Sequence, residues 1–258
     1  MRISSKLFVH DWICGLGRGA ILCRDIFRSI STVKPVWRDV LEEMYFIGVK
    51  SQSVVVITGA FTGMVLSLQS YIEFHKVKLD TATLAVVSVG MGSELGPVLT
   101  GLMVAGRVGA AIAAELGTMT VTEQIDALRT LAAHPVDYLI VPRFLAMMCV
   151  MPLLSAGAVC VGILAAYLVG TFLLGINAAG LWYNMLAHTN LIDISTGMIK
   201  TFVFGGIIAV VACAKGLNCQ QGAEGVGRAT TEAVVYSSIS ILVTNFFLTS
   251  LLNTILPS

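Results

Sequence analysis

Charged side chains are scarce in this sequence. Asp, Glu, Lys and Arg together make up 12% of its 258 residues, and the mean hydropathy is +0.87. Soluble domains carry roughly twice that fraction of charge. The scarcity argues against an ordinary soluble domain and predicts an all-α polytopic membrane protein. The formal net charge of only +1 gives no sign of a nucleic-acid partner.

The sequence also lacks the patterns that would indicate a metal site or a catalytic centre. Its six cysteines form no CxxC pair and have no metal-ligand spacing, so they are interpreted as small apolar residues. No Gly-x-Ser-x-Gly, HExxH or Walker motif is present, and the four histidines are scattered. The glycine-rich stretch 222–227 is followed by Arg228 and Ala229, not by the Lys and Ser/Thr of a phosphate-binding loop. We therefore expect a protein without catalytic or metal-binding residues.

Long apolar runs dominate what is present. Each run is long enough for a helix that crosses a bilayer, which takes roughly 20 residues. The predicted spans are about Phe46–Tyr71, Ala82–Ala114, Leu139–Leu174, Ile194–Ala214 and Glu232–Ile255. The second run is too long for one straight crossing and contains Pro97 and several glycines, so it is predicted to be kinked or broken.

Small residues recur at a four-residue spacing in two of these runs. Gly59 and Gly63 form a GxxxG pattern in the first run, and Gly162, Ala166 and Gly170 form a similar face in the third. Such faces let helix backbones approach closely. They indicate either tight packing or dimerisation.

The first 45 residues form a separate segment of the single membrane domain predicted for residues 1–258. Basic residues alternate there with apolar ones at helical spacing, among them Leu7, Trp12, Ile21 and Phe27. A basic amphipathic helix with an aromatic face lies in the membrane interface and does not cross the bilayer. We expect this segment to end near Pro35 and the transmembrane core to occupy residues 46–258. No apolar stretch and cleavage site typical of a signal peptide follow the basic residues.

Five spans place the two termini on opposite sides of the membrane. The most basic segments are the N-terminus and the loops 115–143 and 215–231. The positive-inside rule predicts that these segments, and hence the N-terminus, are cytoplasmic, while the C-terminus lies on the other side.

Two ionisable residues lie inside the predicted spans. Glu94 is in the second and Lys200 is in the fourth. A charge there is costly unless it is paired, hydrated or neutralised. We expect Glu94 and Lys200 to pair, either in a transport cavity or as a structural link between two spans. Charges at this depth in a broken helix also fit an ion-coupled secondary carrier.

A short polar segment follows the second span directly. Thr120 or Thr122 is placed to cap a helix start, and Ile125 and Leu128 fall on one face with Glu123 and its polar neighbours on the other. A short cytoplasmic helix between two spans is suited to hold a soluble partner. A solvated helix without a partner is the alternative.

The long central word of the sequence resembles the MlaE/YrbE family of ABC-transporter permeases. This word is ELGPVLTGLMVAGRVGAAIAAELGTMTVTEQIDAL, and further similar words are FTGMVLSLQSY, PRFLAMMCVMPLL, IKTFVFG and GVGRATTEAVV. The resemblance covers nearly the whole chain from about residue 45. Two positions depart from it: Ser93 stands where many members have Arg, and Ala133-His134-Pro135 replaces a common Val-Asp-Pro.

The resemblance implies a lipid transporter of the bacterial inner membrane. The chain would be a homodimeric permease that moves phospholipid to or from a periplasmic MCE-domain partner and supports outer-membrane lipid asymmetry. A separate cytoplasmic ATPase would bind ATP and Mg²⁺, so the chain itself would hold no cofactor. Residues implied to couple to that ATPase are Glu115, Thr118, Glu123, Gln124 and Asp126. Leu68 and Tyr71 match family positions near the lipid cavity.

Overall fold

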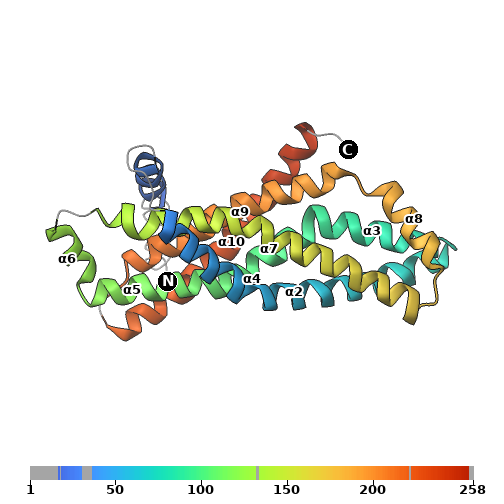
Figure 1. Cartoon of the computed structure of the whole chain (residues 1–258), viewed down its shortest axis with the longest axis horizontal. Helices are drawn as coiled ribbons and strands as arrows, with labels where there is room; N and C mark the ends of the chain where they lie inside the picture. Colours follow the sequence, from blue (N-terminus) through green and yellow to red (C-terminus); the bar gives the residue numbers. More distant parts are fainter. Residues whose placement is uncertain (1–16, 18, 31–36, 132–133, 221, 256–258) are drawn as a thin grey trace, which may run out of the picture. The chain divides into compact units, whose positions relative to one another are not determined.

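The computed structural model describes residues 17, 19–30, 37–131, 134–220 and 222–255, and every regular element within them is helical (Figure 1). Five helical stretches of this described part are long and apolar enough to cross a membrane. They are Trp37–Lys76, Asp80–Val121, Val136–Leu173, Leu191–Leu217 and Ala223–Ile255. The predicted all-α polytopic fold is therefore confirmed.

A helix at residues 19–30 precedes the first span, as the amphipathic pattern predicts. Ile26 is buried, whereas Ile21 and Phe27 remain exposed. The predicted apolar positions Leu7 and Trp12, and the predicted stop at Pro35, lie outside the described residues. Location of this helix in the membrane interface stays a prediction.

The chain divides into two compact units. The first contains the described parts of Met1–Met44, Ala105–Met147 and Gly206–Ser237. The second contains those of Tyr45–Val104, Met148–Gly205 and Ser238–Ser258. The single domain expected for residues 1–258 stays a prediction.

The second span is interrupted, as its length and composition predict. After the short helix η1 (Asp80–Ala82), the α-helices α3 (Thr83–Gly90), α4 (Gly96–Val104) and α5 (Ala110–Val121) alternate with two π-helical segments. These are η2 (Met91–Leu95) and η3 (Ala105–Gly109). Such segments occur often at functional sites, and η2 carries Glu94.

Close backbone contact joins α2 (Trp37–Lys76) to α7 (Val141–Leu168) in the second unit. A Cβ atom added to Gly59 would lie 2.6 Å from the carbonyl oxygen of Ala158, and one added to Gly63 would collide with the backbone of Gly162. The hydroxyl of Ser67 donates to the Ala166 carbonyl at 3.2 Å. The small residues of both runs thus serve tight packing within one chain.

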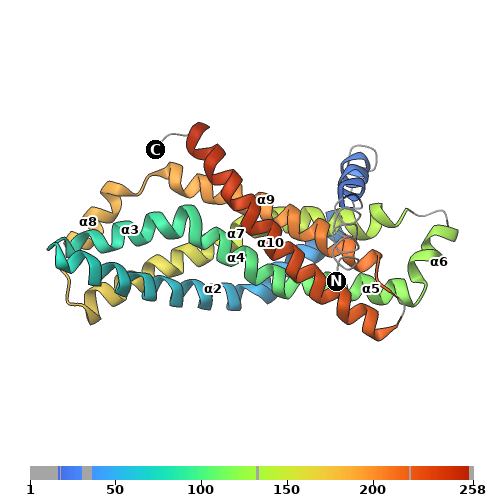
Figure 2. The same ribbon diagram turned by 180° about the vertical axis from the view of Figure 1, so that it is seen from behind.

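The connection between the third and fourth spans contains a short helix. The third span ends in η5 (Val169–Leu173), and α8 (Ala178–His188) follows. The side chain of Asn177 caps α8 by accepting from the Ala179 amide at 3.0 Å. Leu181 joins the core residues Leu84 and Val87 of α3, and α8 runs beside α3 in both views (Figures 1 and 2).

The prediction of a loop at residues 215–231 is wrong over most of that range. Helix α9 (Leu191–Leu217) continues past Lys215, and α10 (Ala223–Ile255) begins eight residues before Thr231. Gly222, with φ of +92°, makes the turn between them. Polar contacts hold the early turns of α10, because Arg228 Nε donates to Glu232 at 3.0 Å and the Thr230 hydroxyl donates to the Gly227 carbonyl at 2.7 Å. A polar, glycine-rich stretch was therefore helical.

Replacing Gly63 with Ala is expected to destabilise the protein, because the added methyl group meets the backbone of Gly162. Overpacking of this kind costs roughly 1–3 kcal/mol. Thermal unfolding in detergent measures the effect as a lower Tm. Gly157→Ala in α7 is the matched control, since nothing lies within 4 Å of its added Cβ. Equal stability of the two variants would contradict the close packing.

Candidate functional site

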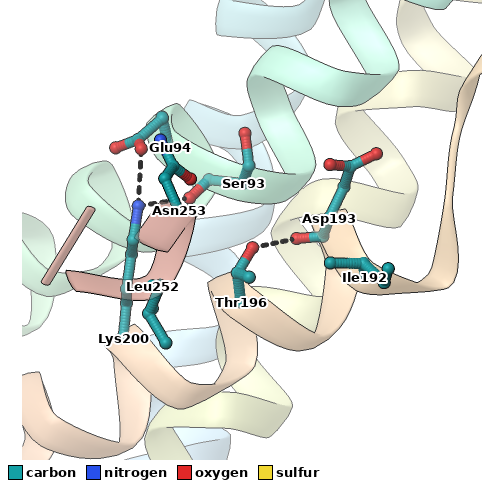
Figure 3. Close-up of a pocket in the computed structure, with 8 residues that line it drawn as sticks. All are labelled: Ser93, Glu94, Ile192, Asp193, Thr196, Lys200, Leu252 and Asn253. Atoms are coloured by element: carbon teal, nitrogen blue, oxygen red, sulfur yellow. Dashed lines mark hydrogen bonds and ion pairs between the residues drawn. The ribbon is translucent and has the colours of Figure 1, made fainter. Parts of the chain in front are cut away.

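A buried ammonium group forms the centre of a polar cluster within the spans. Lys200, on α9, is 2% exposed. Its Nζ atom donates to Glu94 Oε1 at 2.5 Å, to the Ser93 carbonyl at 3.0 Å and to Thr249 Oγ1 at 2.8 Å. Figure 3 shows Lys200 pointing from α9 toward Glu94 and Ser93 of η2. The predicted Glu94–Lys200 pairing is confirmed, and its role in transport or in structure stays a prediction.

Two residues of α10 complete this cluster. Asn245 Nδ2 donates to Glu94 Oε2 at 3.0 Å, and the Thr249 hydroxyl donates to Glu94 Oε1 at 2.9 Å. Neither residue was predicted from the sequence. They lie four positions apart, and hence on one face of a helix, within an otherwise apolar run. That spacing was the only sign of them in the sequence.

A pocket of about 120 Å³ opens beside the ion pair. Its walls come from η2, the start of α9 and the end of α10 (Figure 3). The lining residues are Ser93, Glu94, Ile192, Asp193, Thr196, Lys200, Leu252 and Asn253. The pocket is thus mostly polar, with two carboxylates and one ammonium group.

The predicted short polar helix is α6 (Gln124–Thr130), which follows α5 in the first unit (Figure 1). Ile125 is buried and Leu128 partly buried, whereas Glu123, Gln124 and Asp126 are exposed. The predicted division of faces is therefore confirmed. The role of these residues in ATPase coupling stays a prediction.

The predicted cap of this helix is wrong. Glu123, with φ of 60°, stands at the N-cap of α6 and makes no side-chain capping bond. The Thr122 hydroxyl donates backward to the Thr118 carbonyl at 2.8 Å, and the Thr120 hydroxyl donates to the Leu116 carbonyl at 2.8 Å. A threonine near a helix end can donate to the carbonyl four residues earlier instead of capping the next helix. Of the residues predicted to couple to an ATPase, Glu115 and Thr118 lie in α5 and not in α6.

Glu115 takes part in a second polar cluster, which was not predicted from the sequence and is centred on a buried arginine. Arg143, at the start of α7, is 4% exposed. It donates through Nε to Glu43 of α2 at 3.1 Å and through Nη2 to Glu115 of α5 at 2.8 Å. Its Nη1 atom is buried without a partner among the described residues. One guanidinium thus joins the parts of α2, α5 and α7 that belong to the first unit, and pairs of residues 28 and 100 positions apart leave no trace in the sequence.

The two residues assigned to a lipid cavity both lie on α2. Leu68 is 41% exposed, and Tyr71 packs partly buried against the cluster that contains Leu84 and Leu181. Neither belongs to the residues that line the pocket beside Glu94. Their contact with lipid stays a prediction.

The fold and these clusters define a polytopic α-helical membrane protein with an ion pair inside its spans and a short polar helix between two of them. Comparison with known proteins then identifies its family. Residues 40–251 match the family described as Permease MlaE, so the chain belongs to the MlaE permease family.

Named relatives cover most of the chain. A probable ABC transporter permease protein of Rickettsia typhi is 46% identical over 213 residues, which span 83% of this chain and 82% of the relative. A probable ABC transporter permease protein of Synechocystis is 39% identical, over 93% and 92% of the two chains. The intermembrane phospholipid transport system permease protein MlaE of Haemophilus influenzae is 33% identical, over 95% and 94%. The chain is accordingly a multi-pass permease.

Neutralising Glu94 or Lys200 alone is expected to destabilise the protein more than neutralising both. Removing one partner of a buried pair leaves an uncompensated charge and costs about 3–5 kcal/mol, a figure that is smaller here because Glu94 is only partly buried. Thermal unfolding of Glu94→Gln, Lys200→Met and the double variant forms the test. Additive effects would show that the two groups do not depend on each other.

Replacing Arg143 with Leu is expected to lower the free energy of unfolding by about 2 kcal/mol, because Glu43 and Glu115 lose their shared partner. Arg38→Leu is the control. Its ion pair with Glu42 has side chains that are 85% and 68% exposed, and such pairs contribute at most about 1 kcal/mol. Chemical or thermal unfolding of the two variants side by side makes the comparison. A loss at Arg143 no larger than at Arg38 would refute the cluster.

Proposed function

We propose that this chain is the permease subunit of an ATP-driven phospholipid transporter in the bacterial inner membrane. It would exchange phospholipid with a periplasmic MCE-domain partner and so support the lipid asymmetry of the outer membrane. The observation that carries this proposal is the match to the family over residues 40–251, together with a relative named as an intermembrane phospholipid transport permease that aligns over 95% of the chain.

The energy would come from a cytoplasmic ATPase bound at α6. Glu123, Gln124 and Asp126 are exposed, whereas Ile125 is buried. The helix α6 therefore presents a polar surface to a partner, while Ile125 packs it against the rest of the chain. Backbone hydrogen bonds also hold the turn that precedes α6. The Thr122 amide donates to the Thr118 carbonyl at 3.0 Å, and the Glu123 amide donates to the Thr120 carbonyl at 3.2 Å. ATP and Mg²⁺ would bind to the ATPase and not to this chain.

Two copies of the chain would assemble around the lipid. In the apolar 18-residue core of α10 only 11% is buried, and in that of α2 28% is buried, against 61% in that of α9. Large side chains such as Ile239, Phe246 and Phe247 of α10 and Phe61 and Leu68 of α2 are exposed. These apolar faces suit both a second copy and acyl chains, which supports a homodimer with a lipid cavity lined by α2 and α10.

Orientation follows from charge. With the N-terminus, α6 and the connection between α9 and α10 in the cytoplasm, the basic residues Arg129, Arg143, Lys215 and Arg228 obey the positive-inside rule. The C-terminus is then periplasmic.

An ion-coupled secondary carrier is the weaker alternative. It would use Glu94 and Lys200 as the ion site, yet all three N–H groups of Lys200 already have partners within the chain. Membership of a family whose relatives are named ABC transporter permeases favours the ATP-driven reading.

Reversing the charge at Glu123 and Asp126 to Lys is expected to abolish co-purification of the ATPase, because both carboxylates face outward on α6. The variant should keep the wild-type Tm, since neither side chain is buried. Affinity purification from native membranes followed by mass spectrometry measures the stoichiometry of the ATPase. Glu73→Lys is the control, because Glu73 is exposed and lies near the C-terminal end of α2, outside α6. Unchanged ATPase recovery from the double variant would remove α6 from the docking site.

A further inference from the structure

We propose that the pocket beside the Glu94–Lys200 pair binds a primary ammonium group, supplied by the headgroup of an aminophospholipid, and that Asp193 holds it. This inference rests on the proposed function, because it takes phospholipid as the cargo. It concerns which headgroup the permease prefers.

The charge of the pocket favours a cation. Three of its lining residues are ionisable, namely Glu94, Asp193 and Lys200. Lys200 is bound by Glu94 at 2.5 Å, so its charge is compensated within the chain. Asp193 has no ion-pair partner among the described residues. The pocket therefore keeps one surplus negative charge.

Lys200 has no donor left for an anionic ligand. An ammonium group has three N–H donors, and those of Lys200 point to Glu94, to the Ser93 carbonyl and to Thr249. A phosphate group that entered the pocket would have to displace one of these partners. It would also face the carboxylate of Asp193, which repels it.

The unused hydrogen-bonding capacity of the pocket consists mainly of acceptors. Asp193 accepts from the Asn190 amide through Oδ2, and no described residue donates to its Oδ1. The hydroxyls of Ser93 and Thr196 donate to the carbonyls of Val89 and Asp193, at 2.7 and 2.8 Å, so their oxygens can still accept. Asn253 adds an amide from α10, with one acceptor oxygen and an NH₂ group that can donate. An –NH₃⁺ group, with three donors and no acceptor, complements this set.

Size and shape restrict what can enter. A volume of about 120 Å³ holds a group of a few non-hydrogen atoms and not an acyl chain. In Figure 3, Asp193 and Thr196 lie on one turn of α9, with Ile192 and Leu252 nearby. These two apolar side chains can contact the methylene groups that carry the ammonium group. Partial burial also strengthens the attraction between an ammonium group and Asp193, because the local dielectric is lower than in water.

Ser93 is the residue that leaves Asp193 available. An arginine at this position would place a permanent cation in the lining of the pocket. A guanidinium binds carboxylates through two hydrogen bonds, so it would compensate the charge of Asp193. Serine leaves the carboxylate free to bind a cationic ligand.

The test is lipid selection by the purified chain. Wild type, Asp193→Asn and Ser93→Arg are reconstituted in nanodiscs that contain equal amounts of phosphatidylethanolamine and phosphatidylglycerol, re-extracted in detergent, and their bound lipids quantified by mass spectrometry. Wild type is expected to enrich phosphatidylethanolamine, and each variant to lower that enrichment about tenfold, the effect of one hydrogen bond between charged groups. Asp80→Asn is the control, since Asp80, in η1, pairs with His75 of α2 and does not line the pocket.

The outcomes separate the two proposals. Wild type without any bound phospholipid would count against the proposed function itself. Bound phospholipid with the same headgroup ratio in wild type and Ser93→Arg would overturn the ammonium site alone, even if Asp193→Asn failed to fold. Titration of the chain with ethanolamine hydrochloride in amine-free detergent distinguishes the source of the ammonium group. Binding of ethanolamine that depends on Asp193, without enrichment of the lipid, would overturn the assignment to a lipid headgroup.

Discussion

The buried ammonium group of Lys200 is the constraint on which the arrangement of the second unit depends. A charge inside an apolar span is tolerated only when its hydrogen-bonding groups find partners. Here the partners come from η2, through Glu94 and the Ser93 carbonyl, and from α10, through Thr249. Three segments distant in the sequence are thereby fixed at one point. In the π-helical turn of η2, the Glu94 carboxylate and the Ser93 carbonyl both face the ammonium group of Lys200.

Close backbone packing is the second condition of this fold. Lipid tails are as apolar as leucine side chains, so burial of apolar surface drives helix association weakly within a bilayer. Gly59 and Gly63 instead bring α2 into backbone contact with α7, where dispersion and the Ser67–Ala166 hydrogen bond act. In the first unit, Arg143 links α2, α5 and α7 through carboxylates.

These features suit a permease that provides a path while another subunit supplies the energy. The polar helix α6 is attached to α5 by a closed turn, and Glu115 of α5 is held by Arg143. A partner that moved α6 would therefore act on a well-anchored helix. The exposed apolar faces of α2 and α10, and the small acidic pocket near the ion pair, are separate surfaces with different chemistry. The first suits acyl chains and the second suits a headgroup.

The sequence alone was sufficient for the fold class, the five spans, the short polar helix and the Glu94–Lys200 pairing. Each of these follows from a local pattern or from a strong penalty, since an apolar run of sufficient length must span and a buried charge must be paired. Family membership was also visible, because the words from Glu94 to Leu128 are long and specific.

Only the tertiary structure decided the remaining partners. The start of α10 was mistaken for a loop, since its first turns are polar and glycine-rich, although Ala229 is buried there and Arg228 pairs with Glu232. Thr122 was mistaken for a helix cap. Its hydroxyl can either accept from an amide of the next helix or donate to a carbonyl of the preceding one, and in the structure it donates to the Thr118 carbonyl. Asn245, Thr249 and Arg143 acquire their roles from residues about 28 to 155 positions away. Local sequence fixes what each residue can bind, whereas the packing of distant helices decides which partner it meets.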